Sequence, residues 1–356
     1  MSNVLRQNTN NAIGKALALG WKPVHLQFFP GERTIVHFSN SKSTYASCLR
    51  CPNTPCLKLA PNETIPSNFD RFPADRNTHT CAALAITSNI NGVPVIDPER
   101  CIMCGVCASR CPVGAIRLEP GRGAFVDDEI NAAFVEAKNE TVDTNEVLLQ
   151  RFTELNSEGS MIEESDEIVD DVFTRSNRAW NLIGDRYPNM LARNLLIGAG
   201  LGAAVGRKGN NHMRMDIILS PPGITHGVSE VEFGQESVLN APRDTLDSLA
   251  VLVSRYGWTL ETTTALIVTD ILPNRRSEYW HIIQDIANVL HIRIGTVTVL
   301  ALMLIIWNRK RMDLKKGHPF YVDRDTDSYR TVVLDKLINR ALYLGMDPRP
   351  QVDIAK

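Results

Sequence analysis

The sequence predicts a multidomain protein of mixed class, in which an α+β cysteine-rich domain precedes a larger α/β domain. Two observations lead to this prediction. All eight cysteines lie within one 64-residue window, positions 48–111. After Pro188, apolar segments of strand length alternate with amphipathic segments of helix length, which is typical of parallel strands covered by helices. A chain of 356 residues with 44% hydrophobic content can form two or three such cores.

An acidic segment separates the two domains. Residues 124–171 contain 15 Asp and Glu but only Lys138 and Arg151, a net charge of −13, which leaves +11 for the rest of the chain. We interpret the segment as a solvated helical connector, and a flap that competes with a polyanion for a basic surface is the alternative. The expected parts are a strand-rich extension (1–43), the cysteine-rich domain (44–128), the acidic connector (129–178) and the C-terminal domain (179–356).

The cysteine-rich domain contains an internal repeat of 30 residues. The pattern C-x3-A-I begins at Cys81 and again at Cys111, and residues 95–97 (VID) fall on residues 125–127 (FVD) at the same offset. Cys81 is therefore the counterpart of Cys111. It closes a first set whose earlier members are Cys48, Cys51 and Cys56, and Cys111 closes a second set.

The second set reads C-x2-C-x2-C-x3-C-P from Cys101 to Pro112. Residues 44–128 thereby resemble bacterial-type two-cluster ferredoxins, and in a cytoplasmic protein such clustered cysteines indicate metal rather than disulfides. In that family the last cysteine of each run ligates the other cluster. The resemblance implies two 4Fe-4S clusters, cluster 1 on Cys48, Cys51, Cys56 and Cys111, and cluster 2 on Cys101, Cys104, Cys107 and Cys81.

The first run departs from the ferredoxin pattern. It reads C-x2-C-x4-C, it has a 24-residue insertion before Cys81, and Ala82 stands where proline is expected. Two tetrahedral zinc sites are the alternative, because four-cysteine zinc sites are common and use C-x2-C pairs.

The N-terminus has no apolar segment followed by a small-residue cleavage site, so we expect no secretory signal and a cytoplasmic location. The most apolar run, 297–307, is shorter than the roughly 20 residues that span a membrane. We interpret it as a buried strand and expect no membrane partner.

The C-terminal domain has a regular series of expected elements. Helices are predicted near 189–204, 243–255, 277–290 and 327–344, and strands near 213–219, 227–233, 264–270 and 296–306. Gly198, Gly200 and Ala203 satisfy G-x-G-x-x-A, the motif of a flavin or nicotinamide site. Such a motif needs a strand before it and a full helix after it, and we therefore favour a Gly- and Ala-rich helix packed on a sheet.

Three carboxylates are expected at one edge of this sheet. Asp216 starts one predicted strand, and Glu230 and Glu232 share a face of the next, because alternate residues of a strand point the same way. Burial of such a group is costly without a cation. Solvent-exposed carboxylates at a strand edge are the alternative.

Residues 179–308 resemble the PD-(D/E)xK nuclease superfamily, the fold of many restriction endonucleases, through Asp216, Glu230 and the elements around them. Glu232 stands where that family usually has lysine. The resemblance implies that Asp216 and Glu230 bind Mg2+ or Mn2+, which activates a water for attack on a phosphodiester, with Glu232 as a further ligand or base.

Basic residues near these carboxylates are candidates for nucleic-acid binding. They are Arg193, Lys208, Arg214, Arg309, Lys310 and Arg311. The resulting hypothesis is a metal-dependent DNA endonuclease of restriction or defence type, whose clusters are structural or tune DNA affinity. The expected partners are DNA and either a second copy of the chain or proteins of a defence system. One alternative is an electron-transfer protein whose C-terminal domain binds a nucleotide cofactor or docks a partner, and another is a non-catalytic nucleic-acid-binding homologue.

Overall fold

The computed structural model describes residues 22–28, 33–39, 48, 50–64, 72–111, 116–119, 123–126, 161–209, 214–220, 226–234, 236–270, 273, 277–307, 312 and 314. The chain forms two compact units. Unit 1 comprises residues 1–60, 78–187 and 306–311, and unit 2 comprises residues 61–77, 188–305 and 312–356. Within the described ranges, no helix is long and apolar enough to cross a membrane. The predicted helix at 327–344 lies outside them.

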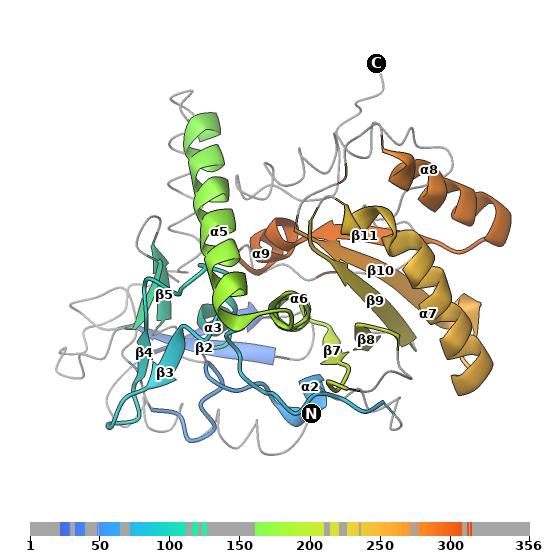
Figure 1. Cartoon of the computed structure of the whole chain (residues 1–356). Helices are drawn as coiled ribbons and strands as arrows, with labels where there is room; N and C mark the ends of the chain where they lie inside the picture. The colour runs from blue at the N-terminus through green and yellow to red at the C-terminus, as the bar shows by residue number, and fades with distance from the viewer. Residues whose placement is uncertain are drawn as a thin grey trace. The chain divides into compact units, whose positions relative to one another are not determined.

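Unit 1 contains antiparallel hairpins and a long helix (Figure 1). The elements are β1 (Lys22–Phe28), β2 (Arg33–Ser39), β3 (Ile86–Ser88), β4 (Pro94–Ile96), α3 (Val106–Ser109), β5 (Ile116–Glu119), β6 (Gly123–Val126) and α5 (Met161–Ile183). Strands β1 and β2 pair from Lys22–Ser39 to Phe28–Arg33, and they belong to the expected strand-rich extension.

The two short hairpins have the same register. Ile86 pairs with Ile96 in the first hairpin, and Ile116 pairs with Val126 in the second. Both partners are shifted by the 30 residues of the sequence repeat, and β4 contacts β6. The predicted duplication is therefore confirmed at the level of strand pairing.

Helix α5 contains residues 161–178 of the expected acidic connector. Val172 and Ala179, two turns apart, are 2% and 5% exposed, so the C-terminal half of the helix has a buried face. Residues 129–160 of the connector lie outside the described residues.

Unit 2 is a five-stranded mixed sheet in the order β11-β10-β9-β8-β7 (Figure 1). The strands are β7 (Gly202–Val205), β8 (Ile217–Ser220), β9 (His226–Glu232), β10 (Thr263–Thr269) and β11 (Ile294–Thr298). The helical segments are α2 (Pro61–Thr64), α6 (Tyr187–Gly198), η1 (Ser237–Leu239), α7 (Ala241–Tyr256), η2 (Leu260–Thr262), α8 (Glu278–Asp285), η3 (Ile286–Leu290, a π-helix) and α9 (Val299–Trp307). Strands β7, β8 and β9 are antiparallel, whereas β9, β10 and β11 are parallel.

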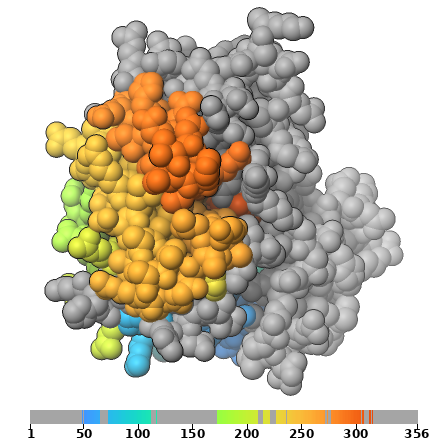
Figure 2. All heavy atoms as spheres, turned by 90° about the vertical axis from the view of Figure 1, so that its right-hand side faces the viewer, coloured from blue at the N-terminus to red at the C-terminus, as the bar shows by residue number. Residues whose placement is uncertain are grey.

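The parallel strands are joined by helices, as parallel connections require. Helix α7 joins β9 to β10, and α8 with η3 joins β10 to β11. Figure 2 shows a face of unit 2 on which α7 and α8 lie side by side. Leu266 and Ile267 of β10 are fully buried, in agreement with the expected covering of the sheet.

The predicted strand at 296–306 is wrong in its second half. Strand β11 ends at Thr298, and residues 299–307 form α9. The Thr298 hydroxyl accepts a hydrogen bond from the Ala301 N–H at 3.1 Å and thus caps the helix. A helix buried on every side has no polar face, so its hydrophobic pattern cannot distinguish it from a buried strand.

The Gly- and Ala-rich segment is not a continuous helix either. Helix α6 ends at Gly198, Gly200 has φ 97°, and the chain continues as β7. A Cβ atom on Gly202 would lie 3.1 Å from the Ser220 Cβ of the neighbouring strand, so glycine allows close pairing there. A dinucleotide site has the opposite order, strand before and helix after. The segment therefore does not form the nucleotide site that G-x-G-x-x-A suggested.

Burial predicts a large stability difference between two leucines of unit 2, Leu266 in β10 and Leu260 in η2. Leu266→Ala should lower the free energy of unfolding by about 2–5 kcal/mol, because it leaves a cavity at a fully buried position. Leu260→Ala, at a position that is 43% exposed, should change it by less than about 0.5 kcal/mol. Chemical denaturation followed by circular dichroism measures both, and equal effects would contradict the assigned core.

Candidate functional site

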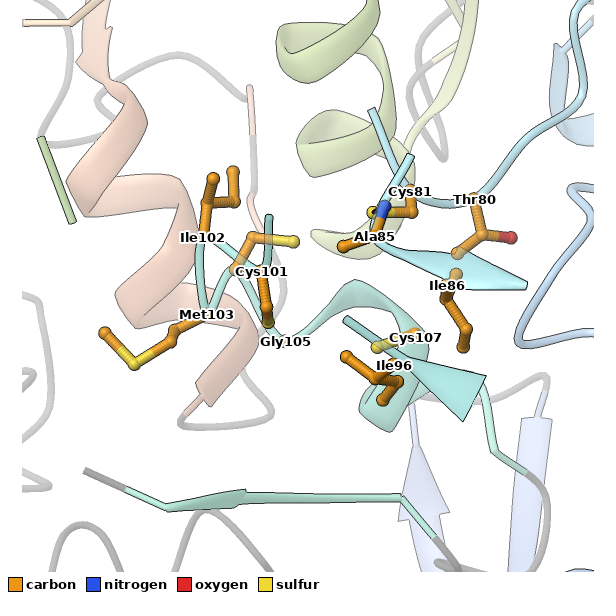
Figure 3. A pocket seen from close by; sticks show the side chains of 11 residues that line it. Thr80, Cys81, Ala85, Ile86, Ile96, Cys101, Ile102, Met103, Gly105 and Cys107 are labelled. Carbon is orange, nitrogen blue, oxygen red and sulfur yellow. Dashed lines mark hydrogen bonds between the residues drawn. The ribbon is translucent and has the colours of Figure 1, made fainter. Parts of the chain in front are cut away.

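The second cysteine run and Cys81 line one pocket in unit 1 (Figure 3). Cys101 and Cys104 lie on the loop before α3, Cys107 lies in α3, and Cys81 precedes β3. The remaining lining is mostly apolar and consists of Thr80, Ala85, Ile86, Ile96, Ile102, Met103 and Gly105. Figure 3 shows Cys81, Cys101 and Cys107 at this pocket on three different segments.

The cysteine loops have an unusual backbone conformation. Met103 has φ 59° and Arg50 has φ 52°, so in the first C-x2-C pair of each run the residue before the second cysteine is left-handed. Gly105, with φ 81°, follows Cys104 and is the N-cap of α3. Non-glycine residues rarely adopt positive φ. The repetition at Arg50 and Met103 indicates that both runs form the same kind of tight loop.

The pocket disfavours free thiolates. Burial, followed by the neighbouring cysteines, raises the pKa of Cys107 well above its ordinary value. The same two causes raise the pKa of Cys104. Burial also raises the pKa of Cys81. The Ala85 N–H donates a hydrogen bond to the Cys81 Sγ at 3.2 Å and offsets part of this increase. Because metal ligation requires thiolates, these sulfurs suit a positively charged centre bound among them.

The first run and Cys111 form a second group. Burial is the largest cause that raises the pKa of Cys56, and Cys111, Cys48 and Cys51 follow as its charged neighbours. Arg110, next to Cys111, donates from Nε to the Pro55 carbonyl at 2.9 Å and from Nη2 to the Lys58 carbonyl at 3.4 Å. The structure thus brings together the same two groups of four that the ferredoxin resemblance implies.

The spacing of the cysteines bears on the zinc alternative. Among the residues that the structure describes, no three His, Cys, Asp or Glu side chains are arranged to hold a single metal ion. Four sulfurs around one zinc would lie roughly 3.8 Å apart, given Zn–S distances of about 2.3 Å. A cubane cluster separates its four thiolates more widely.

Helix α5 contributes residues that the sequence analysis missed. Arg175 Nη1 donates to the carbonyl oxygens of Pro98 at 2.8 Å and Cys101 at 3.2 Å. The Tyr187 hydroxyl, fully buried, lies 3.0 Å from Ser176 Oγ. The only sequence signal for these contacts is the pair Arg175 and Arg178, which ends the acidic run.

In unit 2 the structure brings Asp216, Glu230 and Glu232 to one end of the sheet. Asp216 Oδ1 accepts from Asn189 Nδ2 at 2.8 Å, and its Oδ2 accepts from the Val231 N–H at 2.9 Å. Glu230 is 3% exposed and accepts from the buried Ser248 hydroxyl. The alternative of solvent-exposed carboxylates therefore does not describe Glu230.

Burial and the mutual proximity of these three carboxylates disfavour their charged forms. Burial and then the Asp216 charge raise the pKa of Glu230 well above its ordinary value, and the two side chains are hydrogen-bonded. Burial also raises the pKa of Asp216. Burial, Asp216 and Asp244 raise the pKa of Glu232 to about 7. Magnesium binding by Asp216 and Glu230, with Glu232 as a further ligand or base, stays a prediction.

Three of the six candidate nucleic-acid contacts, Arg193, Lys208 and Arg214, lie in the described part of the chain, and they differ in exposure. Arg193 is fully buried, donating from Nε to Asn194 Oδ1 at 2.9 Å and from Nη1 to the Asn77 carbonyl at 2.6 Å. It lies on the buried face of α6, so its expected contact with phosphates is wrong. Lys208 is exposed, and Arg214 pairs with Asp247 at 2.9 Å. Arg309, Lys310 and Arg311 lie outside the described residues.

Comparison with known proteins points to the cysteine region. The family model of the 4Fe-4S binding domain matches residues 94–117. The iron-sulfur character of this region is therefore confirmed. No solved structure matches the chain.

Curated relatives are iron-sulfur proteins. An uncharacterized ferredoxin of Methanocaldococcus jannaschii is 35% identical over 69 residues, 19% of this chain and 31% of the relative. The polyferredoxin-like subunit of an aliphatic sulfonate oxidoreductase of Pyrococcus furiosus is 28% identical over 80 residues, 22% of this chain and 35% of the relative. Ferredoxin Fdx8 of Sorangium cellulosum is 31% identical over 90 residues, 24% of this chain and 69% of the relative. The chain thus spans about a third of the first two relatives.

Glu232 predicts a pH dependence of stability. Its pKa is about 7 in the folded protein against an ordinary 4.5, so between these values the folded state binds a proton that the unfolded state releases. Stability should fall as pH rises from about 4.5 to 7 and level off above. Glu232→Gln should flatten this decline in thermal unfolding without divalent cations, whereas exposed Glu261→Gln should not. Parallel curves for the wild type and Glu232→Gln would contradict the assignment.

Proposed function

This chain belongs to the ferredoxin family, and we propose that it transfers electrons through two 4Fe-4S clusters bound in unit 1. The proposed ligands are Cys48, Cys51, Cys56 and Cys111 for cluster 1, and Cys81, Cys101, Cys104 and Cys107 for cluster 2. One observation carries the proposal. Two separate groups of four cysteines converge, each across the two halves of the repeat, as crosswise ligation requires.

Each 4Fe-4S cluster, when bound, accepts and releases one electron. The thiolates of the chain would hold it, and the isoleucine and alanine side chains around the pocket keep water away. Backbone N–H groups such as that of Ala85 stabilise the charge on sulfur. Cys107 and Cys56 belong to different sets and are electrostatic neighbours, which supports transfer between two adjacent clusters.

We assign to unit 2 the docking of a redox partner. The Pyrococcus furiosus relative is a polyferredoxin-like subunit of an oxidoreductase, which supports delivery of electrons to a separate enzyme. The order of elements around Gly198 and Gly200 gives no support to a nucleotide cofactor.

Ligand variants test the two-cluster proposal. Cys107→Ser and Cys56→Ser should each lower bound iron from about eight to about four atoms per chain, because each removes a ligand of one cluster. Ile90→Ala, at a fully exposed position of unit 1, should leave the iron content unchanged. Iron and acid-labile sulfide are measured on anaerobically purified protein. Wild-type protein that contains zinc and no iron would overturn the proposal.

A second candidate function is metal-dependent DNA cleavage in unit 2. The observation that favours it is the meeting of Asp216, Glu230 and Glu232 at one end of β8 and β9, within the element order α6, β7, β8, β9, α7, β10. In this candidate, Mg2+ or Mn2+ displaces the protons that Asp216 and Glu230 share. Clusters in unit 1 would then be structural or regulatory.

A cleavage assay separates the two candidates. Under the second, wild-type protein nicks or cuts DNA with Mg2+ or Mn2+ under anaerobic conditions, and Asp216→Ala lowers the rate at least about 100-fold. Asp247→Ala removes an exposed carboxylate of the same unit and serves as the matched control. DNA binding without cleavage indicates a non-catalytic homologue. Absence of both removes this candidate and leaves electron transfer.

A further inference from the structure

Helix α5 places a cation against the loop of the second cysteine run. Arg175 donates two hydrogen bonds from one nitrogen to the carbonyl oxygens of Pro98 and Cys101, and Cys101 is a proposed cluster ligand. Arg175 lies about one turn from Val172 and from Ala179, both on the buried face of the helix. The guanidinium is therefore half-buried and held against the backbone of a ligand residue.

A second contact fixes this part of the helix. Ser176, adjacent to Arg175, lies within hydrogen-bond distance of the Tyr187 hydroxyl. Tyr187 is fully buried and is an electrostatic neighbour of Cys81 and Cys104. The Ser176–Tyr187 contact joins the helix at Ser176 to a buried side chain, which limits the movement of the neighbouring Arg175 charge.

From this geometry we propose that Arg175 is a positioning residue that raises the reduction potential of cluster 2. The proposal rests on the proposed function, since it requires a cluster on Cys81, Cys101, Cys104 and Cys107. The redox step adds one electron from a one-electron donor to the bound cluster. No bond forms or breaks and no proton moves, so the charge of the cluster becomes one unit more negative.

The fixed guanidinium charge stabilises the reduced state more than the oxidised state. An arginine side chain stays protonated at all working pH values, so its effect does not depend on titration. The apolar lining of the pocket lowers the effective dielectric constant around the cluster, while solvent screens the half-buried Arg175 in part. Burial, hydrogen bonding and local charge are the features by which proteins tune iron-sulfur potentials.

Arg178 provides a matched comparison on the same helix. Its Nη1 lies 3.1 Å from Glu99 Oε2, on the same loop that Arg175 contacts. The two side chains are 59% and 82% exposed, so solvent screens the pair and the glutamate neutralises the charge. Loss of Arg178 removes a contact between helix and loop with little change in the field at the cluster.

The test is a redox titration of the anaerobically purified full chain with dithionite, followed by electron paramagnetic resonance. Arg175→Gln should make the midpoint potential of one cluster more negative, by on the order of tenfold in its reduction equilibrium, or about 59 mV for one electron. Arg175→Lys, which keeps the charge, should recover part of the shift. Arg178→Gln should leave both midpoints near those of the wild type.

Cys56→Ser should retain only cluster 2. The midpoint potential of the double variant Cys56→Ser/Arg175→Gln, compared with that of Cys56→Ser, therefore shows whether the shifted midpoint belongs to cluster 2. Equal midpoints in wild type and Arg175→Gln, with both clusters bound, would overturn the role of Arg175 and leave the proposed function intact. A shift in cluster 1 alone, or equal shifts with Arg178→Gln, would also overturn it. Wild-type protein without iron overturns the proposed function itself.

Discussion

The thiols of Cys81, Cys104 and Cys107 resist ionisation in an apolar pocket unless a positive centre is bound among them, and the arrangement of unit 1 follows from this constraint. The pocket takes three cysteines from one tight loop and α3, and the fourth, Cys81, from the preceding repeat. Left-handed residues such as Met103 permit the tight loop, and the Ala85 N–H reaches the Cys81 sulfur. A cluster bound there would join the two halves of the duplicated hairpin. We therefore expect cluster binding and folding of unit 1 to be coupled.

Unit 2 buries the carboxyl groups of Asp216 and Glu230 and stabilises them by hydrogen bonds. Glu230 is hydrogen-bonded to Ser248 and Asp216, and Asp216 also accepts bonds from the Val231 N–H and from Asn189. These contacts offset part of the cost of desolvation, and the raised pKa values of Asp216 and Glu230 favour their protonated forms. Any metal that binds here competes with protons, so its affinity rises with pH.

Much of the iron-sulfur site could be predicted because its information is local. The cysteine spacing on one loop and the repeat at a fixed offset can be recognised without knowledge of the tertiary structure. The pairing of Ile86 with Ile96 and of Ile116 with Val126 follows the repeat. The parallel strands of unit 2 were also predictable from alternating apolar segments. Errors occurred where burial removes the pattern. Residues 299–307 are apolar on every side, and only the cap at Thr298 separates helix from strand. Arg193 was misread because charge alone suggests exposure.

The sequence by itself determined the type of ligand, its spacing and the duplication that groups eight cysteines into two sets, because these depend on neighbours along the chain. Tertiary structure alone decided what surrounds those sets. The contact of Arg175 with the Cys101 carbonyl crosses 74 residues, and that of Arg110 with Pro55 crosses 55. The meeting of Asp216 with Glu230 likewise depends on the register of β8 against β9. Such contacts arise from how elements pack, and no local pattern records which distant backbone group a side chain will meet.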